Sequence, residues 1–241
     1  MRIAVFGDIH SNCIALKCLF KEISKYNVNH LIITGDIFGY YPWASETFLL
    51  IKKIGLPITS ILGNHDQFIL DKIANPNLKL SLSYWPAIEQ NSYQLLSQNP
   101  EAINWLMSMD YKTEFRSNHF TYKIFHGTPD DPLNGRYYPD NQDKYSWFPE
   151  KNSMIILGHT HYPINKKEKT GGFIINPGSV GQPRDGNVDP SWILIDEDKE
   201  KIELLRFSYN IELVKDKLIK LEWDNRAIKA LSKKFKGKLI L

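Results

Sequence analysis

Four apolar stretches of this sequence end in the same way, and this repeated ending constrains the fold more than any other feature. Each stretch runs into a glycine that is followed by aspartate, asparagine or histidine. The four endings are Gly7-Asp8-Ile9-His10, Gly35-Asp36, Gly63-Asn64-His65-Asp66 and Gly158-His159-Thr160-His161. Short apolar runs are typical of buried strands, and the carboxyl ends of parallel strands meet at one edge of a sheet. The pattern therefore predicts Asp, Asn and His side chains gathered at such an edge.

The order of the predicted elements indicates the class of the fold. Hydropathy predicts strands over 2–6, 31–34 and 57–62, with one helix over about 13–25 and another that ends near Ile54. This βαβαβ order favours parallel strands with right-handed crossovers. The expected strands of the second half are 112–116, 120–125, 153–157, 172–175, 192–195 and 201–207. We therefore expect an α/β protein with two sheets face to face and helices outside them.

The sequence contains no repeat or linker, and we expect a single domain over residues 1–241. Within it, we expect residues 66–118 to form a helical segment beside the site and residues 208–241 to form a C-terminal amphipathic helix. Loops 37–45 and 127–150 have no readable pattern. A connection as long as the second is more often functional than a spacer. Its aromatic residues are expected either to pack on one another or to line a specificity wall.

Composition narrows the class of protein. Apolar residues make up 42% of the chain and charged residues 24%, which is typical of globular proteins. The net charge of +3 gives no support for binding nucleic acid. No apolar run approaches the roughly 20 residues that span a bilayer. We interpret the basic residues near the C-terminus as a solvated helix face; they are Lys229, Lys233, Lys234, Lys236 and Lys238.

The chain has two cysteines, Cys13 and Cys18. Five residues apart in a predicted helix, they point roughly 140° apart around its axis and cannot easily form a disulfide. Free thiols are typical of a reducing compartment, so we expect a cytoplasmic protein. The sequence does not indicate an oligomeric state.

Five of the seven histidines directly follow predicted strands. These five are His10, His65, His126, His159 and His161. Together with Asp8, Asp36 and Asn64 they offer eight nitrogen and oxygen donors and no thiolate, a set that suits Mn²⁺, Fe²⁺ or Zn²⁺. Eight donors exceed the need of one ion, and two ions that share a carboxylate would account for them.

These residues resemble a known family. Asp8-Ile9-His10, Gly35-Asp36, Gly63-Asn64-His65-Asp66, His126-Gly127 and Gly158-His159-Thr160-His161 resemble, in order and spacing, the five motifs of the calcineurin-like metallophosphoesterases. The segments Gly7-Asp8-Ile9-His10-Ser11-Asn12 and Asn176-Pro177-Gly178-Ser179-Val180-Gly181 most resemble its small bacterial phosphodiesterase branch. The resemblance spans residues 7–186. It implies a four-layer α/β/β/α sandwich with two mixed sheets and a site for two divalent ions. Mn²⁺ is the preferred ion, with iron, zinc or nickel as alternatives.

The resemblance also implies a role for each residue. One ion would be held by Asp8, His10 and His161, and the other by Asn64, His126 and His159. Asp36 would bridge both ions. His65 would stand over the substrate phosphate, where it would stabilise the transition state or protonate the leaving oxygen. The implied reaction is hydrolysis of a small phosphodiester, or else a phosphomonoester, by a hydroxide held between the two ions.

Residues around the motifs allow more than one interpretation. Asn12 and Arg184 are candidate contacts to the substrate phosphate, although Arg184 would also fit a turn in which it pairs with Asp185. Asp66 fits either a helix N-cap or a partner of the ligands. We assign His30 and His119 to surface or strand-edge positions. Tyr40-Tyr41-Pro42 has a tyrosine where the related branch has glycine, which changes the expected rim of the site.

Two other functions remain as alternatives to the enzyme. The same fold can serve as a non-catalytic interaction scaffold, in which case His65 would be dispensable. A nuclease would need a basic groove that the sequence does not show, and its binding would weaken steeply with salt. No membrane or nucleic-acid partner is expected.

Overall fold

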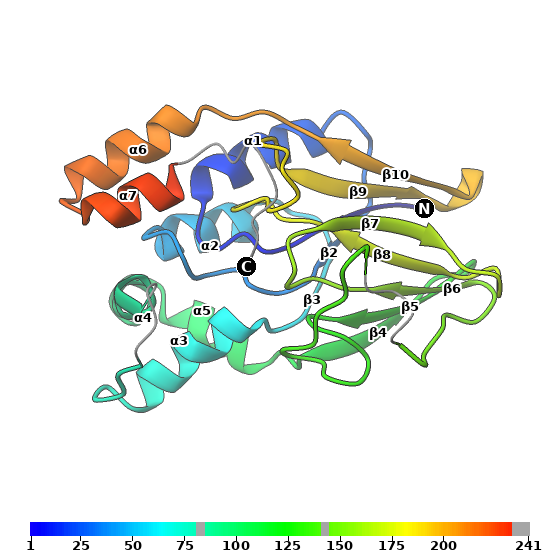
Figure 1. The fold of residues 1–241 in the computed structure, drawn as a ribbon, viewed down its shortest axis with the longest axis horizontal. Helices are drawn as coiled ribbons and strands as arrows, with labels where there is room; N and C mark the ends of the chain where they lie inside the picture. Colours follow the sequence, from blue (N-terminus) through cyan, green and yellow to red (C-terminus); the bar gives the residue numbers. More distant parts are fainter. Residues whose placement is uncertain (81–84, 141–144, 233–241) are drawn as a thin grey trace.

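The computed structural model describes residues 1–80, 85–140 and 145–232. These form two five-stranded sheets (Figure 1). The first has the order β10-β9-β1-β2-β3, and the second has the order β4-β5-β6-β8-β7. The strands of the first are β1 (Arg2–Phe6), β2 (His30–Ile33), β3 (Ile58–Ser60), β9 (Ser191–Asp196) and β10 (Lys201–Arg206). Those of the second are β4 (Lys112–Arg116), β5 (Thr121–Phe125), β6 (Ser153–Ile156), β7 (Pro163–Lys167) and β8 (Phe173–Pro177).

Both sheets are mixed, with a parallel centre. In the first sheet β1, β2 and β3 are parallel, and β9 and β10 extend it antiparallel from β1. In the second sheet β5, β6 and β8 are parallel, and β4 and β7 are antiparallel edges. Parallel strands bring their carboxyl ends to one edge, so each sheet presents several loops on the same side.

The alternation of side chains along β1 explains why the sheets pack face to face. Ile3 and Val5 point into a core shared with Ile124 and Ile156 of the second sheet. Ala4 and Phe6, one residue out of step, point to the opposite face and into the core under the helices. Side chains alternate across a strand, so a wholly apolar strand buries both of its faces.

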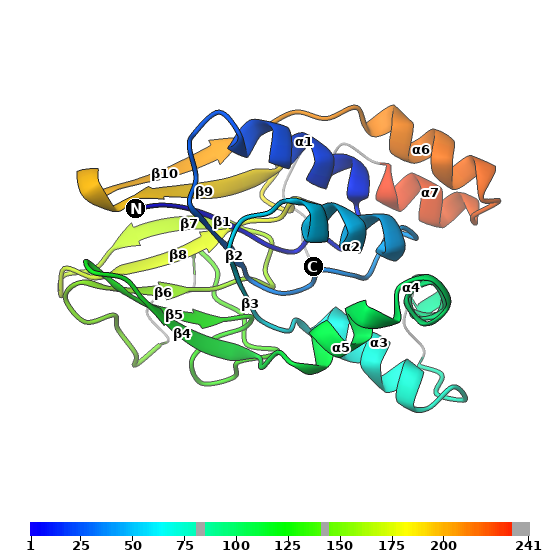
Figure 2. The same cartoon turned by 180° about the vertical axis from the view of Figure 1, so that it is seen from behind.

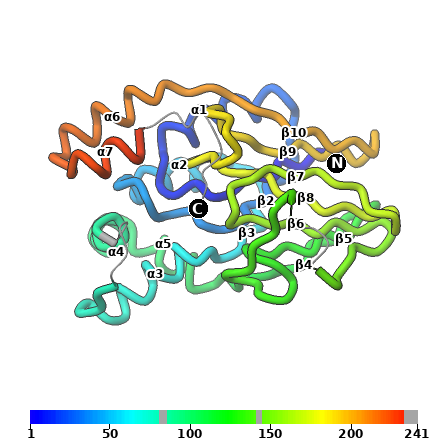
Figure 3. Tube along the Cα trace, in the orientation of Figure 1, coloured from blue at the N-terminus to red at the C-terminus, as the bar shows by residue number. Residues whose placement is uncertain are grey.

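Helices cover the outer face of the first sheet and gather at one end of the molecule (Figures 1 and 2). They are α1 (Cys13–Ile23), α2 (Ala44–Lys53), α3 (Asn64–Ala74), α4 (Trp85–Gln98), α5 (Pro100–Met107), α6 (Ile211–Lys220) and α7 (Asn225–Leu231). Figure 3 shows α6 and α7, at the end of the described chain, lying beside α1 and α2. Val214 and Leu231 there share a core with Cys13 and Tyr41.

Aromatic side chains of residues 137, 145 and 147 cover part of the outer face of the second sheet. Tyr137, Tyr145 and Trp147 have ring centroids 5.0–5.3 Å apart and pack with Ile155 and Ile174 of the sheet. These aromatic side chains therefore pack on one another, which is one of the two arrangements expected for them.

The prediction of an α/β fold with two mixed sheets flanked by helices is confirmed.

Three local predictions need correction. Residues 163–167 form strand β7, which is not among the strands that the sequence pattern predicted. Up to residue 232, where the described part ends, the C-terminal segment forms two helices where one was expected, because α6 ends before Glu222, whose φ is 54°, and α7 begins after it. The segment 66–118 contains helices α3 to α5 but ends in strand β4. Lys233, Lys234, Lys236 and Lys238 lie outside the described residues.

Two further expectations concern the cysteines and the membrane. Cys13 and Cys18 are free, and burial raises the pKa of the Cys13 thiol to about 11. In the part of the chain that the structure describes, no helix combines the length and the apolar character required to cross a bilayer.

Candidate metal centre

The predicted site residues come together where the carboxyl edges of the two sheets meet. Loops after β1, β2 and β3 of the first sheet and after β5 and β6 of the second supply them. The side chains form three clusters whose donor atoms lie within 4.8 Å of one another: Asp8, His10 and His161; His10, Asp36 and His65; and Asp36, His126 and His159. Almost all are buried.

The first cluster is built on Asp8. Its Oδ1 atom lies 3.2 Å from His161 Nε2 and 3.9 Å from His10 Nε2. The two imidazole Nε2 atoms are 3.0 Å apart. The Oδ2 atom instead accepts a hydrogen bond from the backbone N–H of His159 over 3.2 Å. One carboxylate oxygen is thus anchored, and the other faces two ring nitrogens.

The second cluster surrounds His126. Its Nε2 atom lies 3.1 Å from Asn64 Oδ1 and 3.5 Å from Asp36 Oδ1. The ring of His159 is a neighbour, with the two ring centroids 5.2 Å apart. Asp36 lies between the clusters, because its other oxygen, Oδ2, is 3.6 Å from His10 Nε2. The carboxylate of Asp36 therefore presents one oxygen to each cluster.

The outward nitrogens of two histidines are tied to the backbone. His161 Nδ1 lies 2.6 Å from the Gln182 carbonyl, and His126 Nδ1 lies 2.8 Å from the Thr34 carbonyl. A carbonyl only accepts, so both Nδ1 atoms carry a proton, and each ring turns an Nε2 lone pair inward whenever it is neutral. Ligating histidines are oriented in this way in metal sites.

These lone pairs provide a test of whether the residues fit a cation. Asp8 Oδ1 is buried and, among the described residues, makes no hydrogen bond, although the Nε2 lone pair of His161 is 3.2 Å away. Two acceptors at that distance repel unless a positive charge lies between them. The second cluster repeats the arrangement, with His126 Nε2 facing oxygens of Asp36 and Asn64. Nitrogen and oxygen donors without thiolate fit a borderline or hard divalent ion.

The pKa values of the histidines reflect the same electrostatics. Burial lowers the pKa of His159 to about 3, and the nearby positive charges of His126 and Arg136 lower it further. Burial also lowers the pKa of His161. For His126 burial acts in the same direction, but the Asp36 carboxylate outweighs it and raises the pKa to about 9. The second cluster therefore binds a positive charge even when that charge is only a proton.

His65 lies beside the clusters at the start of α3. Its ring centroid is 4.7 Å from that of His10 and 4.5 Å from that of Tyr40. Burial is the main cause that lowers its pKa, to about 4, with Arg184 among the smaller ones. The His65 ring is therefore neutral near pH 7.

The backbone at the site is left-handed at five residues that carry its donors. Their φ values are 47° at Asp8, 51° at His10, 48° at Asp36, 64° at His159 and 61° at His161. For a non-glycine residue this conformation costs about 1–2 kcal/mol. His159 and His161 lie in the turn after β6, outside the strand.

Asp66 anchors the loop after β2. Its two carboxylate oxygens accept hydrogen bonds from the backbone N–H groups of Ile37, Phe38 and Gly63 over 2.9–3.1 Å. The N-cap of α3 is Gly63 and Asp66 is the third residue of the helix, so Asp66 is not itself the N-cap, although its side chain accepts from the Gly63 N–H. Asp66 also fixes the loop that carries Asp36, as expected of a partner of the ligands. A glycine is required at position 63 because the loop that carries Asp36 packs closely against it: a Cβ atom there would lie 2.1 Å from Asp36 Oδ1.

The segment 176–181 supports the site from behind. Ser179 Oγ donates to the Asp8 carbonyl over 2.8 Å, and Asn176 Nδ2 donates to the Gly158 carbonyl over 2.8 Å. These bonds join the ends of β1 and β6, which belong to different sheets. The segment therefore fixes the spacing of the two loops that carry Asp8 and His159.

The structure corrects the expectation for Asn12. Its side chain is fully buried, and Oδ1 caps α1 by accepting from the Ala15 N–H over 3.0 Å. Nδ2 donates to the Gly181 carbonyl and to the Tyr209 hydroxyl over 3.3 Å. With its amide engaged in this way, Asn12 has no group to offer a substrate phosphate.

Arg184 lies against Tyr40 at the rim of the clusters. Its guanidinium donates to the Tyr40 hydroxyl over 2.9 Å and to Gln182 Oε1 over 3.0 Å. The predicted alternative, a pair with Asp185, is wrong because Asp185 pairs with Arg206. The Tyr40 ring in turn lies 4.3 Å from the His10 ring. Arg184 therefore stays a candidate contact to an anion.

Sequence reasoning missed Arg136. It lies in the loop after β5, and its Nε donates to His159 Nε2 over 3.3 Å. The only sequence signal for it was its position in a long loop. Arg136 and Arg184 thus approach different clusters, one beside His159 and the other beside His10.

A cavity of about 660 Å³ opens beside Tyr40 and Gln182. Its walls come from the start of α4 and from α7 with the turn before it, and they are mostly apolar. The wall residues from α4 are Pro86, Ala87 and Gln90, and those around α7 include Trp223, Arg226, Ala227 and Leu231. The cavity therefore shares one wall with the surroundings of His10 and His65.

The sequence is similar to those of a known family and of several known proteins. A model of the family described as calcineurin-like phosphoesterase matches residues 1–173. The uncharacterized protein MJ0912 of Methanocaldococcus jannaschii is 31% identical over 236 residues, which are 90% of this chain and 92% of that protein. A symmetrical bis(5'-nucleosyl)-tetraphosphatase of Psychromonas ingrahamii is 36% identical over 67 residues, which are 27% of this chain and 24% of that enzyme.

Solved structures of similar fold include a metallophosphoesterase. The metallophosphoesterase from Sphaerobacter thermophilus is 25% identical, with a TM-score of 0.77 over 97% of this chain and 99% of that chain. The hypothetical protein PH1004 from Pyrococcus horikoshii has a TM-score of 0.81 over 99% of both chains, and at 20% identity this likeness concerns the fold alone. Because the family model covers most of the sequence, the chain belongs to the calcineurin-like phosphoesterase family.

Proposed function

We propose that this protein is a divalent-metal-dependent phosphoesterase that hydrolyses phosphodiester bonds. One observation carries the proposal: Asp8 Oδ1 is buried without a hydrogen bond among the described residues, while His161 turns a lone pair toward it from 3.2 Å. A cation would remove this repulsion. The family to which the chain belongs supports the same chemistry.

The two clusters would each hold one ion. Asp8, His10 and His161 would hold the first, Asn64, His126 and His159 the second, and Asp36 would contact both. Two bound divalent ions lower the pKa of water and offset the negative charge of phosphate oxygens. The chain keeps its own donors ready for this, because the Gln182 and Thr34 carbonyls fix the rings of His161 and His126. We propose Mn²⁺ as the first ion to test, because the donors are nitrogen and oxygen.

His65 would act on the leaving group. Its ring forms a cluster with His10 and Asp36, but neither of the two proposed ligand sets would need it. The ring would be neutral before substrate binds, and the negative charge of a bound phosphate beside it would favour the protonated form, which can donate its proton to the leaving oxygen. Arg184, on the same rim, would attract the phosphate anion and keep it beside His65.

A diester is the proposed substrate because the site has room for a second ester group. The cavity beside Tyr40 begins next to the rings of His10 and His65 and is mostly apolar. A monoester has only one organic group, whereas a diester would place one group on each side of the phosphate. Comparing p-nitrophenyl phosphate with bis-p-nitrophenyl phosphate tests this preference.

The test of the function uses metal-stripped protein resupplied with Mn²⁺, Fe²⁺, Zn²⁺ or Ni²⁺. We expect hydrolysis of bis-p-nitrophenyl phosphate only after an ion is added. Asp36→Asn keeps the shape of the side chain and removes its charge, so it should abolish turnover. Asp216→Asn, on the exposed face of α6, is the matched control and should behave as the wild type. Metal binding without turnover for any of the four ions would instead favour the interaction scaffold.

A further inference from the structure

We propose that the cavity between α4 and α7 binds a flat heteroaromatic group of nucleobase size, attached to the phosphate that the metal centre hydrolyses. The inference rests on the proposed function and names its substrate class. The volume of about 660 Å³ is within the range of small-molecule sites and far exceeds the space needed for a methyl or ethyl ester.

The cavity and the metal centre are joined by two residues. Tyr40 lines the cavity, and its ring lies 4.3 Å from that of His10 and 4.5 Å from that of His65. Gln182 also lines the cavity, and its carbonyl holds His161 Nδ1. A substrate whose phosphate sits at the clusters would therefore have its ester group directed past Tyr40 into the cavity.

The walls match an aromatic group better than an alkyl chain. Trp223 lines the cavity with an aromatic side chain, and stacking of a base on such a ring is favourable for any base. Gln90 and Arg226 add polar groups, and among residues 1–80, 85–140 and 145–232 neither side chain makes a hydrogen bond. An amide and a guanidinium suit the ring nitrogens and exocyclic groups of a heteroaromatic base.

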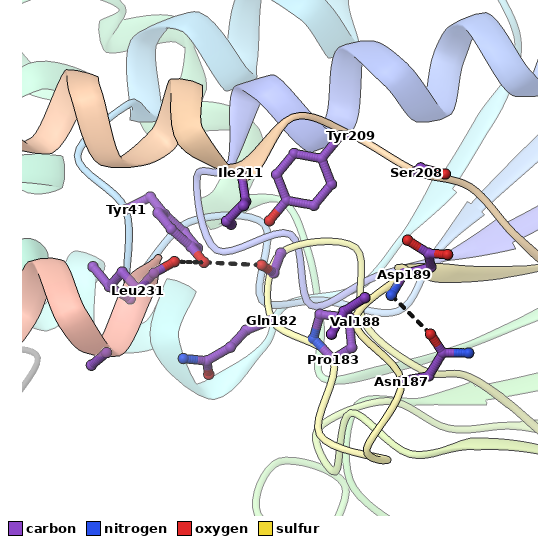
Figure 4. Close-up of a pocket in the computed structure, with 12 residues that line it drawn as sticks. Tyr41, Gln182, Pro183, Asn187, Val188, Asp189, Ser208, Tyr209, Ile211 and Leu231 are labelled. Atoms are coloured by element: carbon purple, nitrogen blue, oxygen red, sulfur yellow. Dashed lines mark hydrogen bonds between the residues drawn. The ribbon is translucent and has the colours of Figure 1, made fainter. Parts of the chain in front are cut away.

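The α7 wall is tied to the site. The Tyr41 hydroxyl lies 3.1 Å from both the Gly181 carbonyl and the Leu231 carbonyl, as Figure 4 shows. It can donate to only one of them at a time. The bond to Leu231 holds α7 against Tyr41, and the bond to Gly181 holds Tyr41 against the loop that carries Gln182. The tyrosine that departs from the related branch thus holds the cavity wall in place.

The first experiment compares two ligands that differ only in the base. Adenosine 5'-monophosphate and ribose 5-phosphate carry the same phosphate and sugar, and each is tested as an inhibitor of bis-p-nitrophenyl phosphate hydrolysis. We expect adenosine monophosphate to inhibit at a concentration at least about tenfold lower, as base stacking implies. Ala227→Phe, which fills the cavity, should bring the two inhibition constants to within about twofold. Lys229→Ala, exposed on the same helix, should leave both unchanged.

A second measurement does not depend on turnover. Saturation-transfer difference NMR on Zn²⁺-loaded protein should transfer saturation to the adenine protons in the wild type and not in Ala227→Phe. If no ion supports hydrolysis, the proposed function fails, and the NMR still decides the inference. If hydrolysis occurs but the two ligands inhibit equally and adenine receives no saturation, the inference is wrong. Hexyl phosphate binding as tightly as adenosine monophosphate would assign the cavity to an aliphatic chain and overturn the aromatic assignment.

Discussion

The backbone N–H of His65 donates a hydrogen bond to Asp36 Oδ1 over 2.8 Å. The bond comes from the main chain, so replacing the His65 side chain leaves Asp36 held in place. His65→Ala should therefore keep both metal ions while kcat falls by about 10²–10⁴, the usual contribution of a general acid. Metal analysis and steady-state kinetics on the same sample check this. His119→Ala, an exposed histidine, is the control. Loss of metal from His65→Ala would make it a ligand instead.

His159 and His161 belong to different clusters although one residue separates them. His159→Ala and His161→Ala should each retain one equivalent of metal where the wild type binds two. The physical reason is that each variant empties one set of donors while Asp36 still serves the other. Metal content after gel filtration gives the stoichiometry. His30→Gln, remote from the clusters, should bind as the wild type. Two equivalents in both variants would contradict the division.

Asp66→Ala should reduce the stability of the fold. The substitution leaves three buried N–H groups, those of Ile37, Phe38 and Gly63, without their acceptor. Each orphaned donor costs about 1–3 kcal/mol, so the free energy of unfolding should fall by at least about 3 kcal/mol. Urea denaturation measures it. Asp216→Ala on the surface of α6 should change it by less than about 0.5 kcal/mol. Equal stability of the two variants would exclude Asp66 as the anchor of the loop.

His30 should make stability depend on pH. Its Nε2 lies 2.8 Å from Thr59 Oγ1, and its ring stacks on Phe115. Burial lowers its pKa in the folded state. The unfolded chain, with a pKa of about 6.5, therefore binds more protons, and the free energy of unfolding falls as pH drops below that value.

His30→Gln removes this titration while keeping a polar side chain near Thr59. The free energy of unfolding of the wild type minus that of the variant should decrease between about pH 7.5 and about pH 5.5. Denaturation at several pH values gives the difference. His119→Gln supplies the reference for an exposed histidine. A difference that is flat or rises toward acid would contradict a lowered pKa.

The strands and the identity of the clustered residues could be predicted because local pattern determines both. Residues 3–6 are apolar on both faces, as expected of a central strand, and Asp8 and His10 follow at the carboxyl end of that strand. Strand β7 escaped prediction because Pro163–Lys167 is a polar edge strand whose partners come only from β8. Edge strands carry little hydropathy signal.

Side-chain partners distant in sequence could not be predicted. An asparagine such as Asn12 can either contact a phosphate or cap a helix. Its hydrogen bonds to Ala15 and Gly181, which only the fold reveals, show that it caps α1. Asp185 was paired with its neighbour, but the partner that the fold provides, Arg206, is 21 residues away. Arg136 reaches His159 from a loop without periodicity.

Five residues that carry donor atoms also have a left-handed backbone, so the same positions must provide both a donor side chain and a strained conformation. Asp8, His10, Asp36, His159 and His161 all occupy a conformation that glycine would adopt without strain. Replacing any of them by glycine would relieve about 1–2 kcal/mol of backbone strain but would also delete a donor and the buried contacts of its side chain, such as the hydrogen bond from the His159 N–H to Asp8 Oδ2. An orphaned buried N–H group costs about as much as the relieved strain, so glycine at Asp8 would remove a metal donor without a gain in stability.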